Sequence, residues 1–348
     1  MRKVLVLAAM AGLIGPAGAE DAKLKVGDKA PPVKAARWWQ GKEVKSFDAG
    51  KVYVVEFWAT WCGPCIVMMP HMGALQSQYK DKGVTFVGFT AKDERGNNLE
   101  KVQAFVEKRA PKLGYTFAYA DDRETYDAWM KAAGRAGIPC CFVVDGAGKV
   151  AYIGHPMYLD VVLPKVVEGK WTADDLKGIA AIEKDVDGVF KALLDPKADP
   201  ETGLKTLAEF EKKYPPLAHI PYFVAPKIGA MIRAKKLDEA KKAAEEVIAR
   251  AVQQEDAGAL QSLSFTLRLP DAKGAKEALA LSLTAAEAAL KLTGEKDPFA
   301  LFMVAEAHFA NGDVARAKDL GSKAVAVADN EGLKKLLQAE IKKYDDKK

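Results

Sequence analysis

Cysteine is scarce in this sequence. Four cysteines occur among 348 residues, as two close pairs, Cys62 with Cys65 and Cys140 with Cys141, and none follows residue 141. Small disulfide-rich proteins have many cysteines distributed along a short chain, so this class of protein is excluded. The two pairs instead indicate local chemistry in the first half of a chain whose length predicts two domains.

Histidine and clustered positive charge are also scarce. The four histidines, His71, His155, His219 and His308, are scattered singly, so they predict no zinc site and no other metal site. The 52 Lys and Arg residues are interspersed with 47 Asp and Glu residues, which leaves no basic stripe of the kind that binds nucleic acid. We therefore expect no nucleic-acid partner.

Long hydrophobic runs are missing, and the apolar run Val4–Ile14 is too short to span a membrane. It follows the basic residues Arg2 and Lys3 and precedes Ala17-Gly18-Ala19, which is the pattern of a signal peptide. Residues 1–19 are therefore predicted to be a cleaved signal peptide, with a buried N-terminal helix or an uncleaved anchor as alternatives. The protein is then expected to be exported, periplasmic or otherwise extracytoplasmic, and soluble after cleavage.

The first cysteine pair lies where a strand is expected to lead into a helix. Lys51–Phe57 has the β-branched and aromatic composition of a buried strand, and Cys65–Tyr79 has helical character. Because the positive end of a helix stabilises a thiolate, Cys62 is the predicted nucleophile. Cys65, one turn further on, can attack a mixed disulfide formed on Cys62 and is the predicted resolving thiol.

Residues 56–65, Glu-Phe-Trp-Ala-Thr-Trp-Cys-Gly-Pro-Cys, resemble the active-site segment of the thioredoxin superfamily. Gly27-Asp28-Lys29-Ala30-Pro31 resembles the opening of its exported TlpA/ResA-like branch. The resemblance covers about residues 24–156 and implies an α/β thioredoxin-like domain, a mixed sheet flanked by helices. It also implies a redox-active Cys62–Cys65 disulfide, no bound cofactor, and contact between Trp61 and substrate. Further strands are expected at 84–89, 141–145 and 149–153, with a helical insertion at 98–109.

The same resemblance implies roles for residues outside the cysteine motif. Gly137-Ile138-Pro139 matches the turn that carries a cis-proline facing the active cysteines, so Pro139 is expected to be cis and the Ile138 backbone to pair with substrate. Glu56 falls where thioredoxins carry a buried acid that accepts the proton of the resolving cysteine. A solvent-facing Glu56 is the alternative, since the register of the strand is open. Met68 departs from the branch, which often has an acid there.

Cys140 and Cys141 also depart from the family pattern, in which a small residue usually follows the cis-proline. Because strand residues alternate, one of the two is expected to point toward the active site and the other into the opposite core. Three interpretations stay open. The pair can be buried as small apolar residues, act as auxiliary thiols that form an alternative disulfide, or join Cys62 and Cys65 in a metal or iron–sulfur ligand set.

The chain changes character after Pro156. Leu237–Ala251 and Lys276–Leu292 are rich in Ala, Leu, Lys and Glu at helical spacing, and Asp297–Asp329 resembles a tetratricopeptide repeat. We expect a thioredoxin-like domain at 20–156, a linker at 157–172 and an all-α, degenerate TPR-like domain at 173–348. The helical domain is predicted either to bind a protein partner or to act as a cap or dimerisation arm.

Two classes of function remain. The intact pair Cys62 and Cys65 favours a thiol-disulfide oxidoreductase that acts on protein disulfides or dithiols, over a non-catalytic protein-interaction module on a thioredoxin-like scaffold. The Gly63-Pro64 dipeptide is the one found in thioredoxin, a reductant at about −270 mV, so a reductase is expected rather than an oxidase. A reductase outside the cytoplasm needs a source of electrons, and a membrane thiol carrier is the expected donor.

Overall fold

The computed structural model describes residues 23–195, 197–268, 276–294, 296–328 and 331–345. The chain divides into two compact units, Met1–Ala181 and Ile182–Lys348. The predicted signal peptide, residues 1–19, lies outside the described residues. Within the described ranges, no helix has both the length and the hydrophobicity that crossing a bilayer requires.

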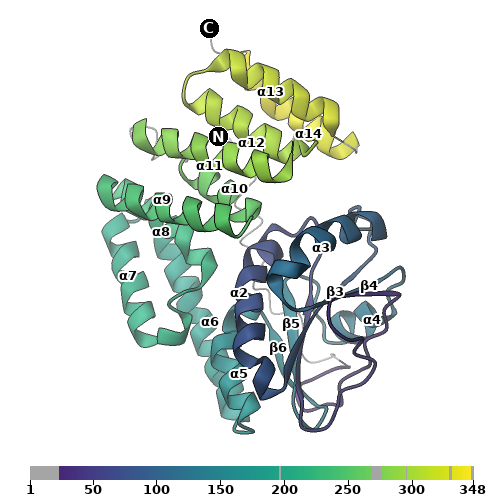
Figure 1. Cartoon of the computed structure of the whole chain (residues 1–348). Coiled ribbons are helices and arrows are strands. Elements are labelled where there is room, and N and C mark those ends of the chain that lie inside the picture. The colour runs from purple at the N-terminus through teal and green to yellow at the C-terminus, as the bar shows by residue number, and fades with distance from the viewer. Residues whose placement is uncertain (1–22, 196, 269–275, 295, 329–330, 346–348) are drawn as a thin grey trace. The chain divides into compact units, whose positions relative to one another are not determined.

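The first unit is built on a six-stranded sheet with the strand order β1-β4-β3-β2-β5-β6 (Figure 1). The strands are β1 (Arg37–Trp39), β2 (Val52–Phe57), β3 (Val84–Ala91), β4 (Thr116–Ala120), β5 (Cys140–Val144) and β6 (Val150–Gly154). β2, β3 and β4 are parallel to one another, whereas the pairings of β1 with β4, β5 with β2 and β6 with β5 are antiparallel. This confirms the mixed sheet that the sequence predicts.

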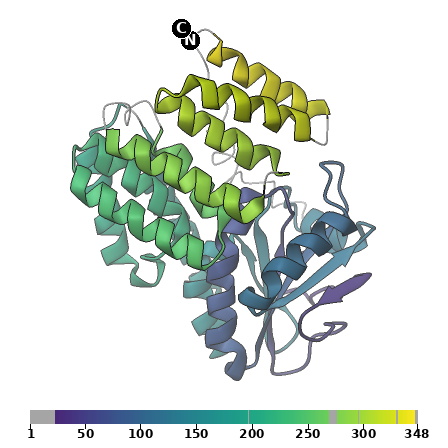
Figure 2. The same cartoon turned by 45° about the horizontal axis from the view of Figure 1, so that its top comes forward.

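One face of the sheet is covered by α2 (Gly63–Tyr79) and α3 (Leu99–Leu113) (Figure 1 and Figure 2). All six residues of β2 are buried, as expected for a strand that is covered on both faces. The two helices pack closely where a glycine removes the side chain: a Cβ at Gly73 would lie 2.4 Å from the Leu113 carbonyl oxygen. The helix expected at 98–109 is therefore present, and it packs beside the helix that begins at the cysteines.

The other face is covered by α4 (Glu124–Tyr126) and the π-helical turn Asp127–Lys131. The Trp129 ring of this turn packs against Phe57 of β2 and Phe142 of β5. Odd-numbered residues of β2 therefore face this side. Even-numbered residues of β2 face α2 and α3, because side chains alternate along a strand.

Residues 157–172, expected as a linker, contain helical structure. A 3₁₀ turn, Pro156–Tyr158, leads into α5 (Leu159–Val167). The four apolar residues that α5 contributes to the core are buried, and His71 of α2 forms a hydrogen bond with Asp160 of α5 at 2.7 Å. The first compact unit accordingly continues beyond the last strand and includes α5.

The second unit is all helical in its described residues, as the sequence predicts, and successive helices form antiparallel pairs (Figure 2). After α6 (Ala173–Leu194), which crosses the boundary between the units, the helices are α7 (Pro200–Lys213), α8 (Pro221–Arg233), α9 (Leu237–Gln253), α10 (Ala257–Thr266), α11 (Lys276–Thr293), α12 (Pro298–Ala310), α13 (Val314–Val327) and α14 (Glu331–Ile341). Small residues allow close packing in the α12–α13 pair, where Ala305 and Ala317 are completely buried. Gly312, with φ of 90°, lies in the turn between these two helices.

Candidate active site

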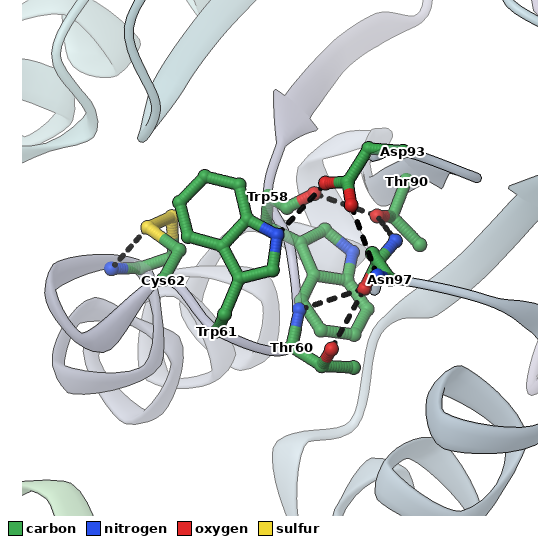
Figure 3. Close-up of a disulfide and its surroundings, with 8 residues drawn as sticks. Trp58, Thr60, Trp61, Cys62, Thr90, Asp93 and Asn97 are labelled. Atoms are coloured by element: carbon green, nitrogen blue, oxygen red, sulfur yellow. Dashed lines mark hydrogen bonds between the residues drawn. A yellow bond between two sulfur atoms is a disulfide. The ribbon is translucent and has the colours of Figure 1, made fainter. Parts of the chain in front are cut away.

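Cys62 and Cys65 lie where β2 passes into α2. Cys62 caps the N-terminus of α2, and its sulfur accepts a hydrogen bond from the Cys65 N–H at 3.2 Å. Pro64 occupies the first helical turn, where a missing N–H removes no helical hydrogen bond. The two cysteines form a disulfide with Cα atoms 5.3 Å apart (Figure 3), so the structure is that of the oxidised protein. The helix N-terminus stabilises the Cys62 thiolate that forms when this bond opens.

A buried hydrogen-bond network holds the loop that leads to the cysteines (Figure 3). Asn97 Oδ1 accepts from the Thr60 N–H at 2.9 Å and from the Thr60 hydroxyl at 2.8 Å. Asn97 Nδ2 donates to Thr90 Oγ1 at 2.9 Å and to the Ala91 carbonyl at 2.7 Å. Thr90 Oγ1 in turn donates to the Trp58 carbonyl at 2.6 Å. The loop is therefore held at Thr60 by the completely buried side chain of Asn97 and at Trp58 by Thr90, which Asn97 also binds.

Trp61 lies at the rim of the site and is 37% exposed. Its Nε1 donates to Asp93 Oδ2 at 2.8 Å (Figure 3). The Arg95 guanidinium lies 3.8 Å from the centre of the Trp61 ring. Asp93 Oδ1 accepts the backbone N–H groups of Arg95 and Asn97, both at 2.9 Å. The side chain predicted to contact substrate is thus accessible and is held in one orientation by the loop after β3.

Ile138 and Pro139 lie at the same edge of the sheet as the cysteine loop. In the antiparallel pairing of β5 with β2, Cys140 is opposite Phe57, the last residue of β2. Pro139 is therefore level with the start of the loop that leaves β2. The Ile138–Pro139 peptide bond is cis, as the resemblance implies. The side chain of Ile138 is partly exposed, whereas Pro139 is buried.

Glu56 is completely buried, which excludes a solvent-facing carboxylate. Its side chain points to the face covered by α2 and α3, and neither carboxyl oxygen has a hydrogen-bond partner. Burial raises the pKa of Glu56 to about 8, because the ionised form loses its water. Met68 on α2, where the TlpA/ResA-like branch often has an acid, is also completely buried. Glu56 thus has a pKa close to the ordinary range of a thiol, as a proton acceptor for Cys65 requires.

Cys140 and Cys141 are free and buried, and they point to opposite faces of β5. Cys140 lies in the apolar core that also contains Phe57 and Phe142. Cys141 is opposite Glu56 in the pairing of β5 with β2 and shares its face. Burial raises the pKa of Cys140 to about 12 and that of Cys141 well above its ordinary value, so both are neutral thiols at pH 7. In the described part of the chain, no group of three or more His, Cys, Asp or Glu side chains is arranged to hold a metal ion.

The support that β3 and its following loop give to the site was missed by sequence reasoning. Thr90, Asp93 and Asn97 form no recognised motif. They reach the cysteine loop because β3 pairs in parallel with β2, which places Phe89 opposite Phe57 and brings the ends of both strands to one edge. The available signal was a set of short polar residues directly after a buried strand.

Comparison with known proteins gives the same assignment for the first unit. Residues 25–157 match the family model described as Redoxin. The chain is 34% identical over 153 residues to protein FixW of Rhizobium leguminosarum, a match that covers 43% of this chain and 69% of FixW. It is 30% identical over 159 residues to the thiol-disulfide oxidoreductase ResA of Geobacillus thermodenitrificans, covering 45% of this chain and 78% of ResA. It is 35% identical over 147 residues to the thiol:disulfide interchange protein HelX of Rhodobacter capsulatus, covering 40% of this chain and 74% of HelX. The chain therefore belongs to the redoxin family: it carries a thioredoxin-like domain of the TlpA/ResA type and is a thiol-disulfide oxidoreductase.

Proposed function

We propose that this protein is an exported reductase of protein disulfides that works through Cys62 and Cys65. The observation that carries the proposal is the Cys62–Cys65 disulfide at the N-terminus of α2. In the reduced protein, the Cys62 thiolate attacks one sulfur of a substrate disulfide, and the other substrate sulfur leaves as a thiolate. Cys65 then attacks the Cys62 sulfur and displaces the second substrate sulfur. The substrate gains two electrons, and the protein returns to the disulfide form of the structure.

Glu56 is the proposed proton acceptor of the second step. Cys65 is completely buried, so its thiol has little access to water when it must lose a proton. The Glu56 carboxylate, on the face of the sheet that α2 covers, takes up that proton. Its pKa of about 8 supports this role, because proton transfer is efficient between groups of similar pKa.

Trp61, Ile138 and Pro139 are the proposed substrate-binding residues. The backbone of Ile138, ahead of the cis-proline, is proposed to pair with an extended segment of the substrate beside the Cys62 sulfur. Trp61 is exposed and offers an aromatic surface to the same segment. Recognition through backbone groups suits many sequences, so we propose protein disulfides in extended segments as the substrate class.

The proposed direction is reduction. The Gly63-Pro64 dipeptide is that of thioredoxin, at about −270 mV, whereas a strong oxidant such as DsbA lies at about −120 mV. Such a gap of about 150 mV corresponds to roughly 7 kcal/mol for two electrons. A reductase exported by a signal peptide at residues 1–19 requires a donor of electrons, and we propose a membrane thiol carrier.

The helical domain, residues 173–348, is proposed to be a degenerate TPR-like array that binds a protein partner. The tight turn at Gly312 and the buried alanines of α12 and α13 support this proposal, since two-helix repeats use small residues where their helices cross. By binding a partner, such a domain would determine which protein comes into contact with Cys62 and Cys65.

Insulin reduction by the full chain, coupled to dithiothreitol, tests the catalytic proposal. We expect turnover in the wild type and none in Cys62→Ser, whereas Cys65→Ser should trap a mixed disulfide with insulin.

A titration of the Cys62–Cys65 couple in glutathione buffers tests the proposed direction of electron transfer. A potential well above about −200 mV would overturn the assignment as a reductase.

A further inference from the structure

The surroundings of Glu56 follow from the register of four neighbouring strands. Cys141 of β5, Glu56 of β2, Gly88 of β3 and Phe117 of β4 lie in one row across the sheet. Residues that are directly opposite each other in a sheet point to the same face, so this row faces α2 and α3. Glu56 therefore has a thiol on one side and a residue without a side chain on the other.

The space above Gly88 is filled by the rings of Phe117 on β4 and of Tyr115, the residue directly before β4. A Cβ built at Gly88 would lie 3.2 Å from the Tyr115 ring and 3.1 Å from the Phe117 ring. The two rings stack with centres 4.5 Å apart. The missing side chain at Gly88, which pairs with Glu56, thus leaves room for both rings over β3.

Hydrogen-bonding groups in this layer are unsatisfied. Both carboxyl oxygens of Glu56 and the Tyr115 hydroxyl are buried without a hydrogen-bond partner. An unsatisfied donor and an unsatisfied acceptor are each costly in an apolar layer, so their placement on one face of one sheet calls for a shared role. Cys141 adds a weak S–H donor on the same face.

The titratable groups around Glu56 are few. Tyr115 and Cys141 both interact electrostatically with Glu56, and Cys140 does so from the opposite face of β5. α2 contributes Cys65 and Tyr79 as its buried titratable residues, and the hydroxyl of Tyr79 interacts with Asp160 and Glu168. The buried residues of α3, Val102, Val106, Ala110 and Leu113, are apolar.

We infer that the Tyr115 hydroxyl and the Cys141 thiol are positioning groups for Glu56, which turn to donate hydrogen bonds to its carboxylate when Glu56 ionises; in the structure neither carboxyl oxygen is hydrogen-bonded. Both can donate a hydrogen bond, and a donor favours the ionised form of a carboxyl group. They thereby set the pH at which Glu56 can take up the proton of Cys65. The inference rests on the proposed role of Glu56, which it deepens by naming the groups that control it.

The test is a ¹³C NMR titration of the Glu56 carboxyl in the oxidised full-length protein, with the signal assigned from Glu56→Gln. Tyr115→Phe removes only the hydroxyl, and we expect it to raise the pKa of Glu56 by about one unit. Cys141→Ala should raise this pKa by less, since a thiol is a weak donor, and Cys141→Ser should bring it back to the wild-type value or below. Tyr53→Phe is the matched control, because Tyr53 is on β2 but faces the opposite core, and it should leave the pKa unchanged.

An unchanged pKa of Glu56 in both Tyr115→Phe and Cys141→Ala would overturn the inference. A second readout separates it from the proposed role of Glu56: the pH profile of the step in which Cys65 displaces the substrate. If Tyr115 and Cys141 position Glu56 and Glu56 accepts the proton of Cys65, the pH profile of this step shifts together with the titration of the Glu56 carboxyl. If the titration shifts and the profile does not, Tyr115 and Cys141 still position the carboxyl, and the proton-accepting role of Glu56 is wrong.

Discussion

The buried acid at position 56 makes a quantitative prediction about stability. Glu56→Gln replaces the carboxyl group by a neutral amide of nearly the same shape. In the folded protein the pKa of Glu56 is about 8, against an ordinary value of 4.5, so folding must take up a proton once the pH exceeds 4.5. The stability of the wild type therefore falls as the pH rises from about 4.5 to about 8. The variant lacks this contribution.

The expected magnitude follows from the difference between the two pKa values. Each unit corresponds to about 1.36 kcal/mol, so Glu56 lowers the free energy of unfolding by about 3 kcal/mol at pH 7 relative to a group that stays neutral. Between pH 5 and pH 8, the advantage of Glu56→Gln over the wild type should grow by about 3 to 4 kcal/mol. A constant cost of burying the amide cancels in this difference. So does the acid destabilisation from His155, whose pKa burial lowers to about 3, since both proteins contain it.

The assay is urea unfolding of both oxidised proteins at pH 5, 6, 7 and 8, followed by tryptophan fluorescence. The chain has six tryptophans, and all of them precede residue 182, so the signal reports on the first unit. They are Trp38, Trp39, Trp58, Trp61, Trp129 and Trp171. A difference between the two proteins that stays constant from pH 5 to pH 8 would refute the reasoning, because Glu56 would then have an ordinary pKa in the folded state.

Three further experiments test the packing and the site. Gly73→Ala should destabilise the first unit by about 2 kcal/mol or more in the same assay, since its Cβ would lie 2.4 Å from the Leu113 carbonyl oxygen of α3. Gly178→Ala should be neutral or slightly stabilising, because nothing lies within 4 Å of its Cβ. Asn97→Ala should cost about 2 to 3 kcal/mol and slow insulin reduction, because it leaves buried groups of the cysteine loop unsatisfied; unchanged turnover per folded molecule would limit the network to a structural role. Ellman's reagent should detect no thiol in the native oxidised protein and two thiols after denaturation, from Cys140 and Cys141, and a native thiol signal would contradict their burial.

The parts of the fold that the sequence predicts well are encoded within short segments. The run Val-Tyr-Val-Val-Glu-Phe has the composition of a buried strand, and the Cys-Gly-Pro-Cys motif follows four residues later, so β2 and α2 begin within two residues of their expected positions. The β5–β6 hairpin was equally local, because Gly146-Ala147-Gly148 separates two apolar runs. The reactive pair Cys62 and Cys65 could therefore be predicted together with the strand and the helix that hold it.

The parts that sequence reasoning missed depend on pairing between distant segments. β4 has the sequence Thr-Phe-Ala-Tyr-Ala, which does not stand out in composition from a buried loop. Asn97 looks like an ordinary loop residue until the parallel pairing of β2 and β3 brings it beside Thr60. The neighbourhood of Glu56 is of the same kind, because Tyr115 packs over the vacant side-chain position at Gly88, the residue that pairs with Glu56.

The energetic cost of Glu56 argues that the residue is present for chemistry rather than for folding. Its neighbours in β2 are apolar or aromatic and completely or almost completely buried, and a valine there would satisfy the strand equally well. A cost of about 3 kcal/mol at pH 7 is a large part of the 5 to 15 kcal/mol that separates folded from unfolded domains. The same burial brings the pKa of the carboxyl close to the ordinary value of about 8.5 for a thiol, so that a proton can pass between them with little change in free energy. Glu56→Gln should therefore be more stable than the wild type and slower in releasing substrate, a combination that a purely structural residue does not produce.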